Sequence, residues 1–169
     1  MTHSEDEHVL PNMTPRSKYV LIGCALLAVL AALAVAGVLA LAALDSSVEG
    51  IEVALSAPAK VRRGDAFQIS ARVRNTASNT QRLVDLDIER SYLRGIAIRS
   101  AEPPWKESTD LLVLGTSYTF DLPIEPGQEL VLVLQATALH SGDFSGDFDF
   151  CINSEVRFLT QQARTVVGR

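Results

Sequence analysis

The sequence predicts a mainly β protein: an antiparallel β-sandwich preceded by one transmembrane α-helix. Residues 19–44 contain no charged side chain, and several later segments alternate apolar and polar residues with a period of two. Turn-forming Gly, Pro and polar residues separate those segments. The expected organisation is a disordered cytoplasmic tail (1–18), a transmembrane helix (19–44), a linker (45–49) and an extracytoplasmic sandwich domain (50–169).

The stretch 19–44 reads YVLIGCALLAVLAALAVAGVLALAAL. As a helix it is roughly 39 Å long, which exceeds the roughly 30 Å hydrocarbon core of a bilayer. A helix also satisfies its own backbone hydrogen bonds in lipid. Arg16 and Lys18 precede it, whereas Asp45 and Glu49 follow it, so the positive-inside rule places the N-terminus in the cytoplasm. The preceding residues, MTHSEDEHVLPNMTPRSK, offer little to bury and are expected to be disordered.

Three other features of this stretch leave alternatives open. Ala40-Leu41-Ala42 fits a signal-peptidase site, although the apolar run is longer than a signal peptide requires. Leu21-Ile22-Gly23-Cys24 is similar to a lipoprotein lipobox, but its cysteine lies near the start of the run instead of at its end. Small residues at every fourth position suggest close helix packing and a possible homodimer through one helix face: Cys24, Ala28, Ala32, Ala36 and Ala40.

The strands are predicted from alternation along the rest of the chain. The clearest has Phe67, Ile69, Ala71 and Val73 on one face, and the next has Val84, Leu86 and Ile88 opposite Asp85, Asp87 and Glu89. Further strands are expected at 51–55, near Ile96 and Ile98, at 118–122, at 129–134, at 147–152 and at 156–167. The continuous apolar run 129–134 favours a central strand covered on both faces.

The connections are predicted from turn chemistry. Residues 62–65, 126–127 and 140–143 are turn-like, 75–80 is a polar loop, and 101–110, which contains Pro103-Pro104-Trp105, is a longer loop. About seven to nine strands result, with no convincing helix, and strands at this spacing favour an antiparallel sandwich.

Two segments carry a resemblance to a known group of domains. Ala66–Asn75 (AFQISARVRN) resembles the B strand of bacterial immunoglobulin-like modules. The second segment begins with Ile124–Leu130, which contains a Pro-Gly turn and leads into an apolar strand, and it continues with Gly142–Phe150. This pattern is similar to that of CARDB-like and NEW3-like β-sandwich domains of bacterial surface proteins. The resemblance implies an immunoglobulin-like sandwich and no catalytic site. The sequence lacks the Cys…Trp…Cys core of antibody domains.

Composition excludes several functions. The net charge is −5, which argues against a nucleic-acid partner, since such a protein carries a basic face. Cys24 and Cys151 lie in different predicted segments and cannot form an internal disulfide framework. Neither cysteine belongs to a zinc-binding spacing.

Few residues suggest chemistry, and each has a structural interpretation beside the functional one. His140 next to Ser141 is a candidate for a catalytic pair or, more simply, a turn histidine. An alternating series of polar residues indicates either a calcium-binding site or an exposed strand face: Asp143, Ser145, Asp147 and Asp149. The series does not fit the EF-hand pattern. Cys151, together with His140 or with a second subunit, is a candidate copper site, although both methionines, Met1 and Met13, precede residue 19. No catalytic, cofactor or metal residue is therefore assigned from the sequence.

Trp105 is either an exposed aromatic contact or a plug of the sandwich, and with Tyr118 it is the candidate for a carbohydrate-binding surface. The function expected from the whole chain is a non-enzymatic, membrane-anchored extracytoplasmic module that contacts other envelope proteins. The bilayer is the expected partner of residues 19–44. A metal-delivery or enzyme-accessory factor and a carbohydrate-binding module are the alternatives.

Overall fold

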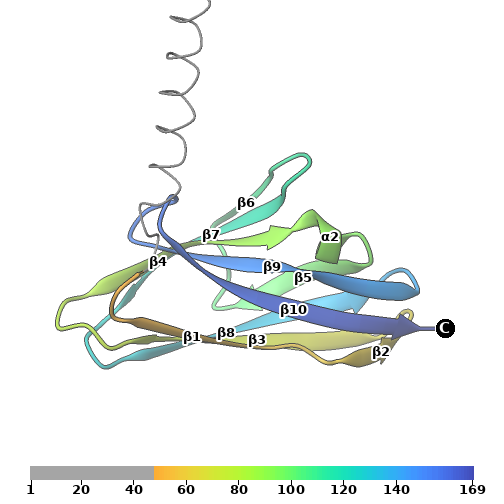
Figure 1. Ribbon diagram of the computed structural model, residues 1–169, viewed down its shortest axis with the longest axis horizontal. Helices are drawn as coiled ribbons and strands as arrows, with labels where there is room; N and C mark the ends of the chain where they lie inside the picture. Colours follow the sequence, from red (N-terminus) through yellow and green to blue (C-terminus); the bar gives the residue numbers. More distant parts are fainter. Residues whose placement is uncertain (1–47) are drawn as a thin grey trace, which may run out of the picture. The chain divides into compact units, whose positions relative to one another are not determined.

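The computed structural model describes residues 48–169, which form two β-sheets packed face to face (Figure 1). The four-stranded sheet contains, in spatial order, β1 (Ile51–Ser56), β3 (Ala66–Asn75), β8 (Glu129–Ala138) and β5 (Ile96–Glu102). The six-stranded sheet contains β2 (Lys60–Arg62), β10 (Phe158–Gly168), β9 (Gly142–Ile152), β4 (Gln81–Glu89), β7 (Gly115–Ile124) and β6 (Glu107–Asp110). Within these residues every strand pair is antiparallel except β2 with β10, so the predicted antiparallel sandwich is confirmed with one parallel pairing.

The predicted tail (1–18) and transmembrane helix (19–44) lie outside the described residues. The helix found within residues 48–169 is α2 (Arg90–Leu93), which has four residues. No helix in this part of the chain is both long enough and apolar enough to span a bilayer.

The core lies between the sheets and is built by the alternation seen in the sequence. Ile69, Ala71 and Val73 of β3 point inward, as predicted, with at most 1% of their surface exposed. They pack in one cluster with side chains from the six-stranded sheet, including Phe148 and Phe150 of β9. Because apolar burial contributes about 25 cal/mol per Å2, this shared cluster is what holds the two sheets together.

The strand order is that of an immunoglobulin-like sandwich with one rearrangement. The order β1-β3-β8-β5 follows the A-B-E-D sheet, and β10-β9-β4 follows the G-F-C sheet. The hairpin β6–β7 extends the second sheet beyond β4. In antibody variable domains the strands added at that edge precede the D strand, whereas here β5 comes before the hairpin. The hairpin therefore enters from residues 103–106, which cross from one sheet to the other.

Residues 101–110 do not form the predicted loop. β5 continues to Glu102, and β6 begins at Glu107. All four residues of β6, ESTD, are exposed, so the strand has no apolar face and no alternation that would reveal it. Its existence depends on the ladder with β7, in which Glu107 pairs with Thr119 and Asp110 with Thr116.

Three further expectations need correction. Val84 is not a core residue of β4: a bulge between Leu83 and Asp85 shifts the register, so Leu83 is buried instead and Val84 is half-buried. β8 is central, as predicted, but only one of its faces is covered, because Val131 remains 46% exposed. The short elements β2 and α2 were not predicted, since neither is long enough to show a period.

Candidate functional site

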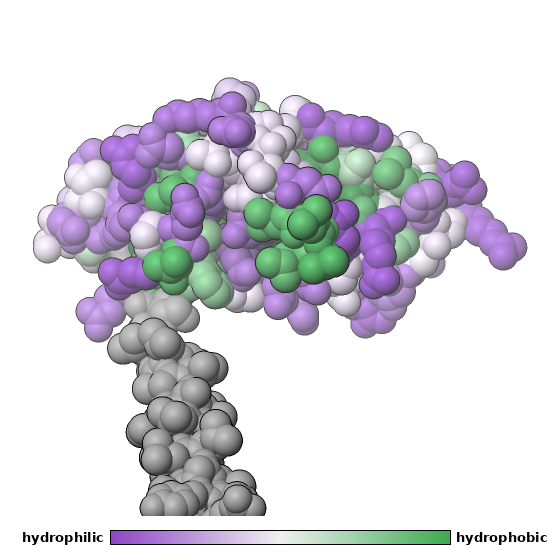
Figure 2. Space-filling view, turned by 90° about the horizontal axis from the view of Figure 1, so that it is seen from above, coloured by the Kyte–Doolittle hydropathy of each residue, from purple (hydrophilic) through white to green (hydrophobic). Residues whose placement is uncertain are grey.

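The hairpin between β6 and β7 ends in an exposed apolar tip. Leu112, Val113 and Leu114 have 80%, 84% and 68% of their surfaces exposed. The hairpin rises away from the sandwich in Figure 1. Figure 2 shows an apolar patch, in green, among hydrophilic residues on the face from which the hairpin rises. Three consecutive exposed apolar residues oppose solubility and contribute nothing to the core, so folding does not account for them.

Local hydrogen bonds shape the turn at this tip. The Leu111 amide donates to the Gly115 carbonyl (2.9 Å), and the Asp110 carboxylate accepts from the Leu112 amide (2.8 Å). Leu112 has a φ of 56°, in the left-handed region that bulky residues seldom adopt. At Gly115 a Cβ would lie 2.0 Å from the Ile88 carbonyl oxygen, so only glycine lets the hairpin approach β4 this closely.

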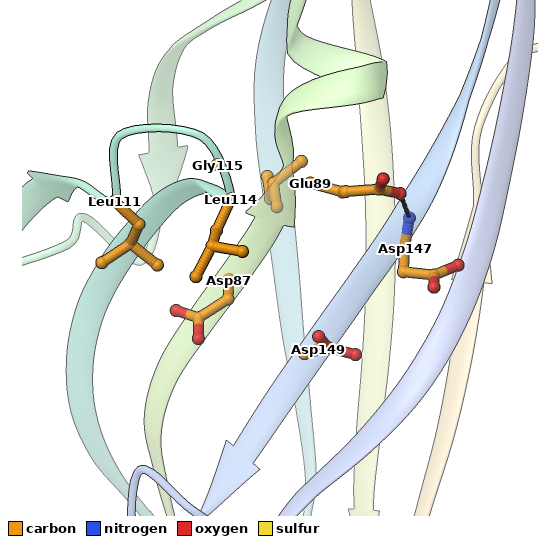
Figure 3. Close-up of a pocket in the computed structure, with 8 residues that line it drawn as sticks. Asp87, Glu89, Leu111, Leu114, Gly115, Asp147 and Asp149 are labelled. Carbon is orange, nitrogen blue, oxygen red and sulfur yellow. Dashed lines mark hydrogen bonds between the residues drawn. The ribbon is translucent and has the colours of Figure 1, made fainter.

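Beside the hairpin, the outer face of β4 and β9 carries carboxylates. Asp87 and Asp149 are directly opposite each other in the β4–β9 ladder, and the Asp147 amide donates to the Glu89 carboxylate (3.1 Å). Figure 3 shows Leu111 and Leu114 of the hairpin on one side of Asp87, and Asp147, Asp149 and Glu89 on the other. A second depression shares Asp87 and Leu111 and adds Asp85 and Glu155. We call the two depressions together the acidic groove. Leu111 and Leu114 form one wall of this groove, and its carboxylates are those of Asp85, Asp87, Glu89, Asp147, Asp149 and Glu155.

The charge of the acidic groove is not neutralised by the surrounding protein. The salt bridges among residues 48–169 join Arg82 and Lys106 to Asp121, Arg90 to Asp110, and Arg164 to Asp143; none includes a groove carboxylate. Neutral donors supply some contacts: the Thr160 hydroxyl donates to Asp149 (2.5 Å), and the Gln162 amide to Asp147 (3.4 Å). The groove is therefore a strongly negative surface beside an apolar tip.

Burial shapes the protonation of the groove. It raises the pKa of Asp87, an effect that a Ser117 hydrogen bond opposes and the Asp85 carboxylate reinforces. Burial likewise raises the pKa of Asp149, with a contribution from the neighbouring Asp147 and Asp87 charges. One oxygen of Asp87, Oδ1, is buried and has no hydrogen-bond partner among the described residues. An unsatisfied buried acceptor costs about 1–3 kcal/mol, so this oxygen lowers the stability of the fold.

Cys151 lies next to the groove but is not a reactive thiol. It is 1% exposed, and its Sγ lies 3.8 Å from both the Asp87 Oδ2 atom and the Glu155 carbonyl oxygen. Burial, followed by the charges of Asp87, Asp85 and Asp149, raises the pKa of this thiol to about 12. Since the thiolate is the nucleophile and the metal ligand, Cys151 remains a protonated, inert side chain.

His140 lies far from Cys151. It is exposed in the turn before β9, beside Arg63 and Arg169, whereas Cys151 is near the other end of the same strand. Gly142 and Cys151 are nine residues apart, so about 30 Å of strand separates the two ends. Ser141 donates to the Gly168 carbonyl oxygen (3.3 Å). The structure therefore does not bring His140 and Cys151 together in one chain, as the first form of the copper site required.

The four residues considered for calcium lie along one face of β9. Asp143 is bound through two hydrogen bonds to Arg164 (2.9 and 2.5 Å), and Asp147 and Asp149 belong to the acidic groove. The interpretation as a solvent-facing strand face is confirmed for Asp143 and Ser145, which are exposed. In the described part of the chain, no group of three or more His, Cys, Asp or Glu residues has the arrangement of a metal site.

Trp105 closes the side of the sandwich where the chain crosses from β5 to β6. It is half-buried, packs against the core and contacts Tyr118, with ring centroids 4.8 Å apart at 54°. Trp105 is therefore a side chain packed on the core, as the plug interpretation expected, and not a free aromatic contact. Tyr118 is only 6% exposed, so the two rings do not form the open platform that a carbohydrate-binding surface requires.

Sequence reasoning missed the residues that define the groove's apolar wall. Leu111–Leu114 forms a run of four apolar residues, LLVL, directly after the polar segment ESTD. A run of this kind outside an alternating strand is the pattern that could have revealed the tip. The acidic side was visible as Asp85, Asp87 and Glu89 in one strand and Asp147 and Asp149 in another, but their pairing follows only from the β4–β9 ladder.

No protein-family model matches the sequence, and no curated protein matches it significantly. Solved structures with a similar fold include the CARDB domain of a Pyrococcus furiosus protein, with a TM-score of 0.44 and 12% identity over 70% of this chain and 94% of that domain. A cupredoxin domain of amoB from Nitrosocaldus yellowstonii aligns with a TM-score of 0.45 and 13% identity, over 74% of this chain and 91% of that one.

Escherichia coli alpha-2-macroglobulin aligns with a TM-score of 0.40 and 14% identity over 71% of this chain, which spans 7% of that protein. A CARDB domain is thus among the similar structures, as the sequence resemblance implied. The strand order of the two sheets makes residues 48–169 an immunoglobulin-like β-sandwich, and no property of these similar structures is transferred to this chain.

Proposed function

We propose that this chain is a non-enzymatic, membrane-anchored binding module whose extracytoplasmic sandwich holds another protein of the envelope. One observation carries the proposal. An exposed apolar tip, Leu112–Leu114, projects beside a face whose six carboxylates take part in no ion pair within residues 48–169. Both features oppose folding and solubility, and a bound partner would relieve both.

The chemistry of the described residues supports a binding role over catalysis. Cys151 is protonated, and Ser141 is engaged with a backbone carbonyl. His140 lies at the opposite end of β9 from the groove's Asp149. A nucleophile needs an adjacent base and an orienting group, and these candidates are not arranged in that way.

Metal analysis tests the competing metal-delivery function. Purified full-length chain should contain no metal that depends on His140 or Cys151. Stoichiometric metal that is lost in His140→Ala or Cys151→Ala would overturn the proposal and favour a metal-handling role.

The membrane anchor is part of the proposal and has its own test. Residues 19–44 supply an uncharged stretch, and Arg16 with Lys18 favours a cytoplasmic N-terminus. A tagged full-length chain should resist carbonate extraction, and protease added from outside should digest the sandwich but spare an N-terminal tag. A soluble product that starts near residue 43 would instead indicate a cleaved and exported domain.

A contact with a protein partner is tested by crosslinking in native membranes followed by purification of the tagged chain. The expected result is a specific partner that is lost when Leu112, Val113 and Leu114 are all changed to Ser. A partner retained at the wild-type level in that variant would show that the hairpin tip is not the contact.

A further inference from the structure

We propose that the acidic groove receives a lysine or arginine side chain of the partner protein. The aliphatic part of that side chain lies against Leu111 and Leu114, and its charged group lies among the carboxylates around Asp87. This inference rests on the proposed function, because it names the chemistry of the partner segment that the binding module recognises.

The two walls of the groove differ in the way such a side chain requires. One wall is apolar and comes from the hairpin, with Leu111 half-buried and Leu114 exposed; the other is acidic and comes from β4 and β9 (Figure 3). Lys and Arg combine an aliphatic stem with a charged end, and they place each in its preferred surroundings. An apolar side chain would leave the carboxylates unpaired, and a short cation would leave the leucines exposed.

The floor of the groove brings two carboxylates together. Asp87 and Asp149 are half-buried, line the same depression and lie directly opposite each other in the β4–β9 ladder. A guanidinium or ammonium group placed over this pair donates to both carboxylates, and hydrogen bonds between charged groups are stronger than neutral ones.

The charge around the tip also selects the class of partner. The carboxylates beside Leu112–Leu114 repel the anionic headgroups that attract peripheral proteins to membranes. They attract a basic protein segment, whose own apolar residue can cover the tip. Charge complementarity therefore favours a protein with Lys or Arg next to an apolar side chain over a lipid surface or a second copy of this acidic domain.

The test uses labelled heptapeptides, Gly-Ser-Xaa-Leu-Xaa-Ser-Gly, and the full-length chain in an uncharged detergent. Xaa is arginine, norleucine (an aliphatic stem without charge) or 2,4-diaminobutyric acid (a charge on a short stem). Fluorescence anisotropy at low salt, with protein-free micelles as a blank, measures binding. The arginine peptide should bind about tenfold or more tightly than either analogue, because each analogue loses one half of the contact.

Paired variants of the chain locate the binding. Asp87→Asn with Asp149→Asn, and separately Leu114→Ser, should each weaken the arginine peptide about tenfold. The matched controls lie in β8 of the other sheet: Glu129→Gln removes an exposed acid, and Val131→Ser an exposed apolar residue. Neither control should change binding.

Each contrary outcome overturns the inference in a defined way. Equal binding of the norleucine peptide would indicate an apolar or lipid-binding surface, and equal binding of the diaminobutyric peptide would indicate unspecific charge attraction. Peptide binding that survives the groove variants would place the site elsewhere. The inference and the proposed function fail separately: a crosslinked partner without arginine selectivity retains the function and overturns only the groove's specificity.

Discussion

Asp87 of β4 and Asp149 of β9 are directly opposite each other in an antiparallel ladder. Like charges in this position destabilise a sheet by about 0.2–1 kcal/mol. Neither carboxylate belongs to a salt bridge within residues 48–169, and burial raises the pKa of both. The pair thus weakens the fold at the centre of the groove that we assign to binding.

Neutralising either member should stabilise the domain. We expect Asp87→Asn or Asp149→Asn to raise the free energy of unfolding at pH 7 by about 0.5 kcal/mol, which corresponds to a shift of about 2–4 °C in the melting temperature. Trp105 is the one tryptophan of the sequence, so its fluorescence reports unfolding of the sandwich in the full-length chain. The control is Asp143→Asn, which removes a partner of Arg164 and should not stabilise. A lower melting temperature in both groove variants would contradict this account.

The gain in stability from replacing Asp87 and Asp149 with Asn should depend on pH in a defined direction. The pKa values of Asp87 and Asp149 are raised in the folded chain, so the folded state holds these protons more tightly than the unfolded state. Their contribution to stability is therefore complete below the ordinary value of 3.8 and is lost as pH rises through the folded-state values.

The carboxyls of Asp121 and Asp143 titrate in the opposite sense. Hydrogen bonds from Lys106 and Arg82, and from Arg164, lower their pKa values, so their contribution is lost as pH falls. Comparing the melting temperatures of the wild type and the Asp87→Asn/Asp149→Asn variant isolates the contribution of these two carboxyls. The difference in melting temperature should be smallest below pH 4 and grow towards pH 7; a constant difference would show that charge is not its cause.

Neighbouring residues of one sheet should differ sharply in their tolerance of charge. Ile69 and Leu132 are fully buried, so changing either to Asp places an unpaired charge in the core and should prevent folding. Val131, the residue before Leu132, points to the outer face and is 46% exposed, so Val131→Asp should fold. Circular dichroism and Trp105 fluorescence show which of the three variants fold. Loss of structure in Val131→Asp would indicate that this face is covered.

Tyr92 connects α2 to β10 through a hydrogen bond to Thr165. The Thr165 hydroxyl donates to the Pro58 carbonyl oxygen (2.9 Å), so the Tyr92 hydroxyl is the donor in its own 2.9 Å contact with Thr165. Tyr92→Phe should lower the free energy of unfolding by about 0.5–1.5 kcal/mol. In a Thr165→Val background, Tyr92→Phe should lower the free energy of unfolding by less, because the acceptor is already gone. An equal decrease in both backgrounds would show that the two hydroxyls are not coupled.

Most of the sandwich could be predicted from the sequence because its core strands have one covered face. Ile69, Ala71 and Val73 alternate with polar residues, and that alternation fixes both the strand and its buried side. Alternation does not reveal a strand that is defined only by its hydrogen-bonded partner. β6 is polar on both faces, and the bulge beside Leu83 changes which residue faces the core without changing the composition of β4.

The acidic groove could be predicted only in fragments. The acids of β4 and β9 are visible as two separate alternating stretches, but the bulge and the ladder register decide that Asp87 faces Asp149. The leucine wall is contributed by a hairpin attached at the edge of the sheet, through contacts such as Gly115 against Ile88 that are distant in sequence. This site depends on strand register and on the placement of an added hairpin, so it can be recognised only in the three-dimensional structure.

The most direct measurement is photo-crosslinking from the hairpin tip in native membranes. A photoreactive amino acid at Val113 should crosslink to one protein through a segment that carries Lys or Arg beside an apolar residue, identified by mass spectrometry of the joined peptides. The crosslink should disappear when Asp87 and Asp149 are changed to Asn, and the same probe at Val131 should not form it. Crosslinks to lipid alone, or the same protein captured equally from both positions, would contradict the account.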